Sequence, residues 1–520
     1  MDFAQPYLPT IEDPLMTQAY LIHQGLDEFA AARDQFGQLI EALQSEFNLE
    51  KEHGDIEALI WQDGKELLRR MLQGHLDLRA AREPKREHVI GGDGIIRTHR
   101  RRGCTRTLMS LFGEVSVKRM GYGERGQESV FPLDARLNLP RDKYSHGLRQ
   151  RVGEEVVKGS FDEAVGSVKR TTGGKVAKRQ SEEIAVELSQ DFEAFYDRGR
   201  SEGPEQTSDP LILSEDGKGI VMRTEDLREA TRKAALSAKH KLKTRLSQGE
   251  KKNRKRMAMV ATVYSIARHI RRPEAIMGLE EDPQDAPSSR PRARNKRVWA
   301  SVERDPGKVT EELFEEAQRR DPEQKRPWVM LVDGHKDQLK HIWANMKHFG
   351  VQVILILDFI HVLEYLWKAA YCFHPPGSEQ AEAWVAERAL QILKGKASIV
   401  AGGIRRSATL RGLSAKEREA VDECAGYLLN YKDMLKYDQY LAAGLPIATG
   451  VIEGACRHLV NDRMGITGAR WGLQRAEAIL KLRSLKSSGD SEAYWEFYKD
   501  QTLKRNYASQ YESFPLQEAA

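Results

Sequence analysis

Three acidic residues occupy positions at which carboxylates can hold metal ions. Asp216 in SEDGKG and Asp333 in LVDGHK each follow a short apolar run and each precede a glycine. An aspartate at the end of such a strand projects from the open edge of an α/β sheet, where ligands bind. Glu453 lies in a predicted helix, VIEGACRHLV. Together the three side chains form an all-oxygen set that suits Mg2+ or Mn2+.

A carboxylate set of this kind supports chemistry at phosphorus. Two metal ions activate water or a 3′-hydroxyl and stabilise the leaving oxygen of an in-line displacement, so no side chain has to act as general base. A single acid after a strand is more often a turn or capping residue. The interpretation therefore depends on Asp216, Asp333 and Glu453 as a set, all three being both catalytic and metal-binding.

Asp358 is an alternative to Asp333 as the second ligand. It ends the next predicted strand, and His361 follows one helical turn later. We expect Asp333 to be the ligand because its strand should adjoin that of Asp216, whereas the strand of Asp358 lies one further away. Asp358 and His361 are expected to be accessory, near the metal site or behind its ligands. A buried, hydrogen-bonded histidine is the alternative for His361.

Residues 206–358 contain the elements that must position Asp216 and Asp333, and their pattern predicts an α/β core. LILSEDG, KGIVM and RMAMVATVYSIA predict three strands, and a polar, proline-rich loop covers 273–307. VTEELFEEAQRR then predicts a helix, RPWVMLVDG a strand, KDQLKHIWANMKHF a helix and VQVILILD a last strand. Apolar strands without polar alternation indicate a sheet covered on both faces. This order predicts a ribonuclease-H-like core, with the first and fourth strands as neighbours.

Helices dominate the rest of the chain. Residues 359–445 predict an all-helical insertion, residues 446–486 return to the core with one long helix carrying Glu453, and residues 487–520 predict a polar, peripheral tail. Residues 1–100 contain apolar positions at helical spacing, which predict two or three amphipathic helices. These form either a self-association bundle or a small core.

A β-hairpin and a DNA-binding motif are predicted between these regions. In residues 101–140, TLMSLFGEVSVKRMGYGE has two alternating runs around Phe-Gly-Glu, which predict a hairpin. Residues 141–205 predict a helix-turn-helix. Its third helix would present Lys175, Lys178 and Arg179 to DNA. An ordinary helical linker is the alternative.

Basic residues cluster although the formal net charge is only +5. Three runs of Lys and Arg lie at 82–103, 232–256 and 289–297. Such clusters neutralise phosphates and release counterions from a polyanion. We therefore expect double-stranded DNA as the partner.

Four residues near Glu453 are further candidates for DNA binding. Arg457, His458 and Arg463 lie on or just after the predicted helix and are expected to contact phosphates. Trp471 is expected either to stack on an unpaired base or to pack between helices.

The four cysteines and the hydropathy exclude several classes. The cysteines are far apart and form no C-x-x-C pair, which argues against a disulfide framework and a cysteine zinc site. No apolar run approaches the roughly 18–20 residues that span a bilayer, and the acidic, proline-broken N-terminus is unlike a signal peptide. We expect a cytoplasmic protein with no membrane partner.

The motifs resemble those of ISKra-type bacterial insertion-sequence transposases, a DDE family distantly related to the Mutator-like group. SEDGKGI resembles the first-strand motif, VMLVDGHKDQL the second, and LDFIHVLEYLWKAA the D-x-x-H segment. IATGVIEGACRHLVNDRMGITGARWGLQRAEAILKLRS resembles the block with the final Glu, and SLFGEVSVKRMGY the upstream hairpin. The resemblance covers roughly residues 100–485.

The resemblance implies a ribonuclease-H-like fold with a helical insertion, magnesium dependence, and strand cleavage and transfer at terminal inverted repeats. It also implies target DNA as a partner, a nucleoid-associated bacterial location and, by analogy, a homodimer or larger assembly on DNA. Related proteins often continue the hairpin with cysteine pairs, but GYGERGQESVFPLD has none, so no zinc is expected. A nuclease that does not join DNA and a domesticated repressor remain alternatives. The complete carboxylate set argues against the repressor.

Overall fold

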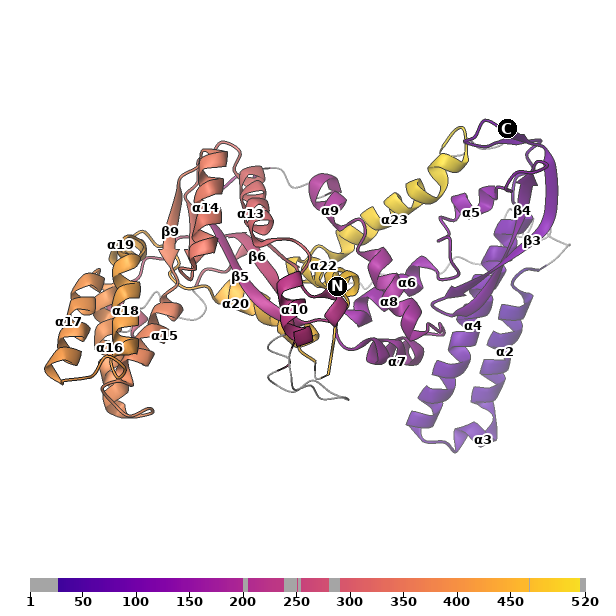
Figure 1. The fold of residues 1–520 in the computed structure, drawn as a ribbon. Helices are drawn as coiled ribbons and strands as arrows, with labels where there is room; N and C mark the ends of the chain where they lie inside the picture. Colours follow the sequence, from indigo (N-terminus) through magenta and orange to yellow (C-terminus); the bar gives the residue numbers. More distant parts are fainter. Residues whose placement is uncertain are drawn as a thin grey trace, which may run out of the picture. The chain divides into compact units, whose positions relative to one another are not determined.

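The computed structural model describes residues 27–199, 204–237, 250, 254–279, 290–466 and 468–514. The chain forms two compact units (Figure 1). Unit 1 comprises Met1–Ile184 and Trp495–Ala520, and unit 2 comprises Ala185–Tyr494. The candidate carboxylates all belong to unit 2, whereas the predicted helix-turn-helix begins in unit 1.

Unit 1 begins with helices, as predicted. They are α2 (Ala30–Gln44), α3 (Glu46–Leu49) and α4 (His53–Ala81), and α2 packs along α4. The part of the prediction before residue 27 lies outside the described residues.

The predicted hairpin of unit 1 is confirmed, although its first strand starts earlier than expected. A short pair, β1 (Val89–Ile90) and β2 (Ile96–Arg97), precedes β3 (His99–Ser110) and β4 (Gly113–Gly123). Ser110 pairs with Gly113 across a two-residue turn, and the φ of 125° at Gly113 favours glycine. Helix α4 packs on β4 over a buried apolar cluster that includes Leu76 and Val117.

Three helices follow the hairpin where helices were predicted: α6 (His146–Val156), α7 (Phe161–Thr171) and α8 (Lys178–Leu188). The short helix α5 (Pro132–Arg136) lies in residues 101–140, where no helix was predicted. Ser160 and Glu163 form a capping box at the start of α7. The break after α7 crosses the hairpin turn closely, because a Cβ on Gly173 would lie 2.2 Å from the carbonyl oxygen of Phe112.

The predicted peripheral tail is wrong for the described residues after 494. Helix α23 (Ser491–Tyr507) leads back into unit 1, where Tyr507 and Tyr511 are buried with Val89 and Tyr122 in one apolar cluster. The Tyr507 hydroxyl donates to the carbonyl of Leu139. The prediction failed because the segment is polar overall, although it contains a few large aromatic residues that are buried.

Unit 2 contains a five-stranded mixed sheet in the order β7-β6-β5-β8-β9. The strands are β5 (Leu211–Val221), β6 (Lys255–Ser265), β7 (Arg294–Ser301), β8 (Trp328–Val332) and β9 (Val353–Leu357). β5, β8 and β9 are parallel, whereas β6 runs antiparallel to both β5 and β7. The predicted adjacency of the first and fourth strands is confirmed.

Two of the predicted strand assignments are wrong. LILSEDG and KGIVM are one strand, β5, so Asp216 lies within a strand and not at its end. Gly217 and Gly219 suggested a turn, but all eleven residues of β5 pair with β6. Residues 294–301, predicted as loop, form the third strand β7. Pairing with a neighbour decides strand formation there more than local composition does.

Helices cover both faces of the sheet. On one face lie α13 (Pro306–Arg320) and α14 (Lys336–Phe349), because buried Glu215 of β5 meets Thr310 of α13. On the other lie α20 (Gly450–Ala455) and the π-helical segment Cys456–Asn461, where Cys456 contacts Asp216. α22 (Leu473–Ser488) packs on β7, where its Glu477 accepts the N–H of Val302 at 2.9 Å.

The predicted helical insertion is confirmed. It comprises α15 (Phe359–Ala370), α16 (Glu379–Leu393), α17 (Ala397–Leu410), α18 (Glu419–Asn430) and α19 (Tyr437–Ala442). The single long helix predicted around Glu453 is instead α20, the π-helical segment and α21 (Asp462–Met464), followed by a break before α22.

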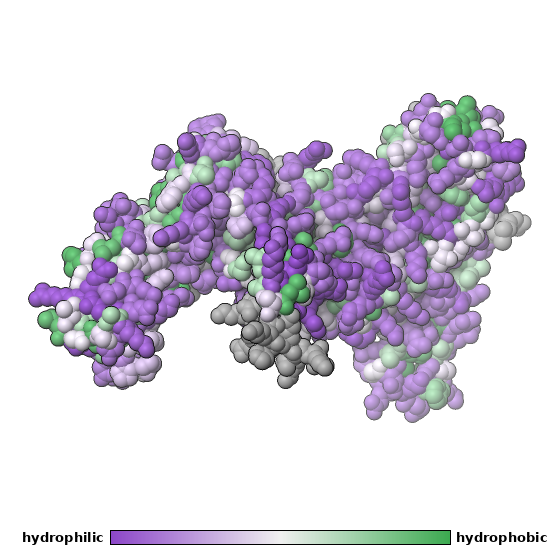
Figure 2. Space-filling model, viewed as in Figure 1, coloured by the Kyte–Doolittle hydropathy of each residue, from purple (hydrophilic) through white to green (hydrophobic). Residues whose placement is uncertain are grey.

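The exposed surface matches the high content of charged residues. Figure 2 shows a largely hydrophilic face with scattered apolar residues. Within the described part of the chain, no helix has the length and apolar character needed to cross a membrane.

Candidate active site

Strand register puts Asp216 and Asp333 on the same face of the sheet, just beyond the residues through which β5 and β8 pair. β5 and β8 pair only from Leu211 with Trp328 to Ser214 with Leu331. Paired residues of neighbouring strands share a face, and side chains alternate along each strand. Asp216 and Asp333 each follow the last pair by two residues, on strands about 5 Å apart. The two aspartates are therefore assigned to the same face, just beyond the paired region.

Asp216 is surrounded by donors. Its Oδ2 lies 3.0 Å from the Lys218 ammonium and accepts the Cys456 thiol at 3.3 Å, and its Oδ1 accepts the Gly217 N–H at 2.6 Å. Burial by itself would lower the pKa of Lys218, but the hydrogen bond and charge of Asp216, with Glu453 nearby, raise it above its ordinary value. Asp216 thus already binds a cationic group.

Glu453 is exposed on α20, which packs against β5 and β6. Its N–H donates to the carbonyl of Thr449 at 3.1 Å. Its charge reaches both Lys218 and Cys456, whose pKa is raised first by burial and then by Asp216. The charges of Asp216 and Glu453 therefore both affect Lys218 and Cys456.

Asp333 is exposed in the turn between β8 and α14. Its Oδ1 accepts the N–H of His335 at 2.8 Å. Two tyrosines of the insertion hold the turn: Tyr427 donates to the carbonyl of Asp333 at 2.8 Å and Tyr431 to that of Gly334 at 2.5 Å. Sequence reasoning missed these tyrosines. Their i, i+4 spacing placed them on one helix face, but nothing local indicated the partner.

Asp358 differs from the other aspartates because it is buried, with 1% of its side chain exposed. Its Oδ1 accepts the N–H of Ile360 at 2.9 Å and so caps α15. Its Oδ2 accepts the Thr449 hydroxyl and lies 3.4 Å from Nδ1 of His361. The hydrogen bond to Asp358 raises the pKa of His361, against the effect of burial. Both carboxylate oxygens of Asp358 therefore stabilise the fold, and Oδ2 fixes Thr449, the residue before α20.

Glu215 is a second acid that sequence reasoning missed. Its carboxylate points to the face opposite Asp216, is almost fully buried, and accepts the Thr310 hydroxyl at 3.1 Å. Burial raises its pKa to about 8. The sequence could have indicated this position, because neighbouring residues of a strand point to opposite faces and Glu215 directly precedes Asp216.

The donor chemistry fits a hard divalent cation, but the ligand set is not assembled. Asp216, Asp333 and Glu453 are carboxylates on β5, on the turn after β8 and on α20, and Asp216 pairs with the Lys218 ammonium at 3.0 Å. Among the residues that the structure describes, no three His, Cys, Asp or Glu side chains form a group that could hold a metal ion.

The predicted DNA-binding residues of unit 1 are at the surface. Lys175 is exposed just before α8. Lys178 pairs with Asp162 at 2.5 Å, and Arg179 pairs with Glu183 at 3.1 Å. Both pairs are exposed, so they contribute little to stability.

The predicted DNA-binding residues of unit 2 divide into two kinds. Arg457 and His458 are exposed, and both lie near Asp462, at 3.8 and 3.1 Å. Arg463 and Trp471 are buried, with the guanidinium 4.7 Å from the indole ring. The indole N–H donates to the carbonyl of Met464 at 3.2 Å. This geometry favours packing over base stacking for Trp471.

No family model matches the chain. A curated relative, the UPF0236 protein in the vanSb 3′ region of Streptococcus gallolyticus, is 29% identical over 119 residues. The match covers 22% of this chain and 25% of the relative. The chain thus aligns with about a quarter of a protein whose name states no activity.

Proposed function

We propose that this protein is a DNA transposase with a ribonuclease-H-like core. It binds the terminal inverted repeats of an insertion sequence, cleaves the DNA strand and joins the end to a target. The observation that carries the proposal is the placement of two aspartates on adjacent parallel strands, β5 and β8, of a β7-β6-β5-β8-β9 sheet. A third carboxylate, Glu453, stands on a helix packed against β5.

The three carboxylates would hold Mg2+ or Mn2+. When bound, such ions activate the attacking oxygen and stabilise the leaving oxygen of the phosphoryl transfer. The chain's own residues do the rest. The Lys218 ammonium balances the charge of Asp216, and the buried Asp358 with Thr449 holds the start of the helix that carries Glu453.

DNA as the substrate is supported by charge. An acidic centre repels a polyanion unless basic groups surround it. Arg457 is exposed in the same unit as the carboxylates, four residues after Glu453, and Lys175, Lys178 and Arg179 are exposed in unit 1. Joining is preferred over plain hydrolysis because the helical segment before the core suits a protein that selects specific DNA ends.

The test uses purified protein, magnesium and a supercoiled donor plasmid with the element's inverted repeats. The wild-type protein should give strand-transfer products. Asp216→Asn and Glu453→Gln should each reduce cleavage by at least about 10³-fold, since members of a catalytic set act as a unit. Binding to end DNA, measured without metal, should persist.

Asp337→Asn is the matched control, because Asp337 is an exposed acid four residues beyond Asp333. It should leave cleavage unchanged. Cleavage that survives Asp216→Asn would overturn the site assignment. Hydrolysis without joined products, across a range of metal and target concentrations, would favour a nuclease of the same fold.

A further inference from the structure

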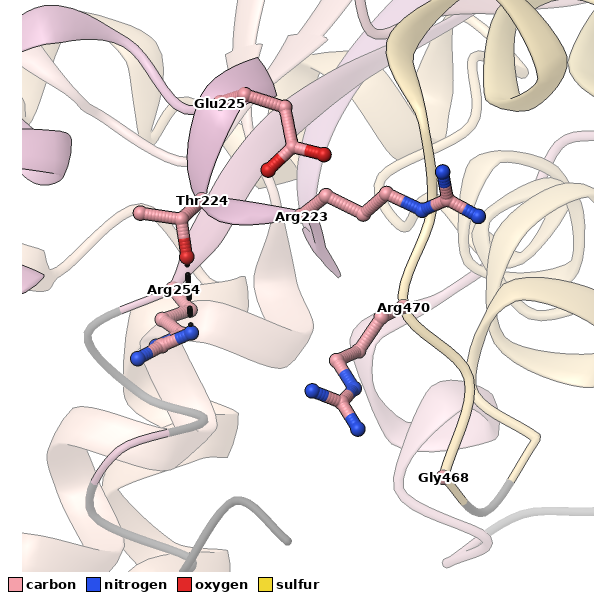
Figure 3. Close-up of a pocket in the computed structure, with 6 residues that line it drawn as sticks. All are labelled: Arg223, Thr224, Glu225, Arg254, Gly468 and Arg470. Carbon is pink, nitrogen blue, oxygen red and sulfur yellow. Dashed lines mark hydrogen bonds between the residues drawn. The ribbon is translucent and has the colours of Figure 1, made fainter. Parts of the chain in front are cut away.

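A cavity of about 550 Å³ in unit 2 is lined by three arginines (Figure 3). Its lining residues are Arg223, Thr224, Glu225, Arg254, Gly468 and Arg470. The arginines come from three separate segments: the end of β5, the start of β6 and the turn before α22. None of them was predicted as a site residue. We call this site the arginine pocket.

Backbone hydrogen bonds fix two of the arginines side by side. The N–H of Arg223 donates to the carbonyl of Trp471 at 2.8 Å, and the N–H of Trp471 donates to the carbonyl of Val221 at 3.0 Å. Arg470 is therefore held next to the extension of β5. Gly468 has a φ of 82°, a left-handed conformation that glycine adopts without strain in this turn. Buried Trp471 anchors the same turn from the other side.

The third arginine is oriented by a side-chain hydrogen bond. Arg254 Nη1 donates to the Thr224 hydroxyl at 3.0 Å, shown as a dashed line in Figure 3. Arg254 directly precedes β6, so the antiparallel pairing of β5 with β6 brings it back to the end of β5. A long-range pairing thus completes the pocket.

The pocket has an excess of positive charge. Within the described part of the chain, none of its three guanidiniums is ion-paired with a carboxylate, and Glu225 is its one acidic lining residue. Three like charges around one cavity repel each other unless an anion lies between them. Guanidinium groups bind phosphate through paired, fork-like hydrogen bonds.

We propose that the arginine pocket binds the sugar–phosphate backbone of the DNA substrate. The proposal rests on the proposed function and adds a second contact point to it. The volume of the arginine pocket, about 550 Å³, exceeds that of a bare phosphate and lies in the range of small-ligand pockets. Arg223 is seven residues from Asp216 along the direction of β5, which corresponds to roughly 23 Å. A DNA strand that runs along β5 would therefore contact both the pocket and the region of the carboxylates.

The test measures the salt dependence of binding to a DNA duplex, in EDTA, by fluorescence anisotropy. The compared proteins are the wild type, the triple variant Arg223→Gln/Arg254→Gln/Arg470→Gln, and the corresponding triple Arg→Lys variant. Each arginine lost should reduce the slope of log K against log salt by about one and weaken binding roughly eightfold at 0.1 M salt. The lysine variant should keep most of the slope, since the charge remains.

Arg406→Gln is the control for net charge, because Arg406 is an exposed arginine of α17 outside the pocket. It should leave the slope unchanged. An unchanged slope in the triple Gln variant, with an unchanged melting temperature, would overturn the pocket assignment and leave the transposase proposal intact. Tighter binding of an RNA duplex of the same sequence through these arginines would also overturn it.

The two proposals fail separately. If Asp216→Asn still cleaves while the Gln variant loses the salt slope, the catalytic assignment is wrong and the pocket stands as a DNA-binding site.

Discussion

At the residue scale, Asp333 and Asp358 differ in exposure and in how many carboxylate oxygens accept a hydrogen bond from the protein. Asp216 and Asp333 are at least partly exposed, and Asp216 binds an ammonium. Asp358 is buried and uses both oxygens to cap α15 and to accept the Thr449 hydroxyl. This difference favours Asp333 over Asp358 as the second metal ligand in the proposed site.

Substitution of Asp358 separates a structural from a metal-binding role. Asp358→Ala should lower the free energy of unfolding by about 2–4 kcal/mol, since it removes a helix cap and leaves the buried Thr449 hydroxyl unpaired. Asp358→Asn should cost less, because asparagine also caps helices. Chemical denaturation measures both. If Asp358→Asn left stability unchanged but abolished magnesium-dependent cleavage, Asp358 and not Asp333 would be the ligand.

At the element scale, β5 serves two purposes on its two faces. Asp216 faces α20 and the π-helical segment, whereas Glu215 is buried against Thr310 of α13. A buried acid in a central strand makes the stability of the sheet depend on pH. Burial favours the protonated form of Glu215 and raises its pKa from 4.5 to about 8.

The sign of this effect follows from the raised pKa. Glu215 contributes stability that is fully present below its unfolded-state pKa and is lost as the pH rises through about 8. Glu215→Gln removes this dependence. The unfolding free energy of the variant relative to the wild type should therefore increase between pH 5 and pH 9, by on the order of 4 kcal/mol. A difference that stays constant over this range in urea denaturation would contradict the protonated, buried state.

At the scale of the whole molecule, the chain leaves unit 1 after Ile184 and returns to it at Trp495. Its last described segment supplies buried Tyr507 and Tyr511 to the cluster around Tyr122. Unit 1 therefore depends on residues from both ends of the sequence. Each unit has its own core and is expected to unfold in its own transition.

Two tyrosine substitutions test this organisation. Tyr507→Ala should destabilise unit 1 by about 3–5 kcal/mol, the usual range for a large buried aromatic side chain. Tyr437→Ala is the matched variant in unit 2, where Tyr437 is buried and donates to the carbonyl of Leu357 at 2.7 Å. Scanning calorimetry should show each variant lowering a different transition. Equal shifts of all transitions by both variants would mean that the chain unfolds as one cooperative unit.

The sequence by itself determined the local features of this protein. Helical periodicity located α2, α4 and the insertion helices, and the alternation around Phe112 and Gly113 located the hairpin, because these patterns depend on near neighbours in the chain. It also proposed Asp216, Asp333 and Glu453 as candidates by residue type, although Asp216 lies within a strand and not at its end as expected. The adjacency of the strands that carry Asp216 and Asp333 was predictable because few connections are possible for alternating strands and helices.

The tertiary structure decided what depends on distant partners. LILSEDG and KGIVM, predicted as two strands, form the single strand β5 because both segments pair with β6. Residues 294–301, predicted as loop, form the strand β7 because they also pair with β6. Burial distinguishes Asp358 from the partly exposed Asp216. The fold also brings Arg223, Arg254 and Arg470 together around one cavity. Burial and long-range pairing arise only when segments far apart in the chain meet, so no local pattern contains them.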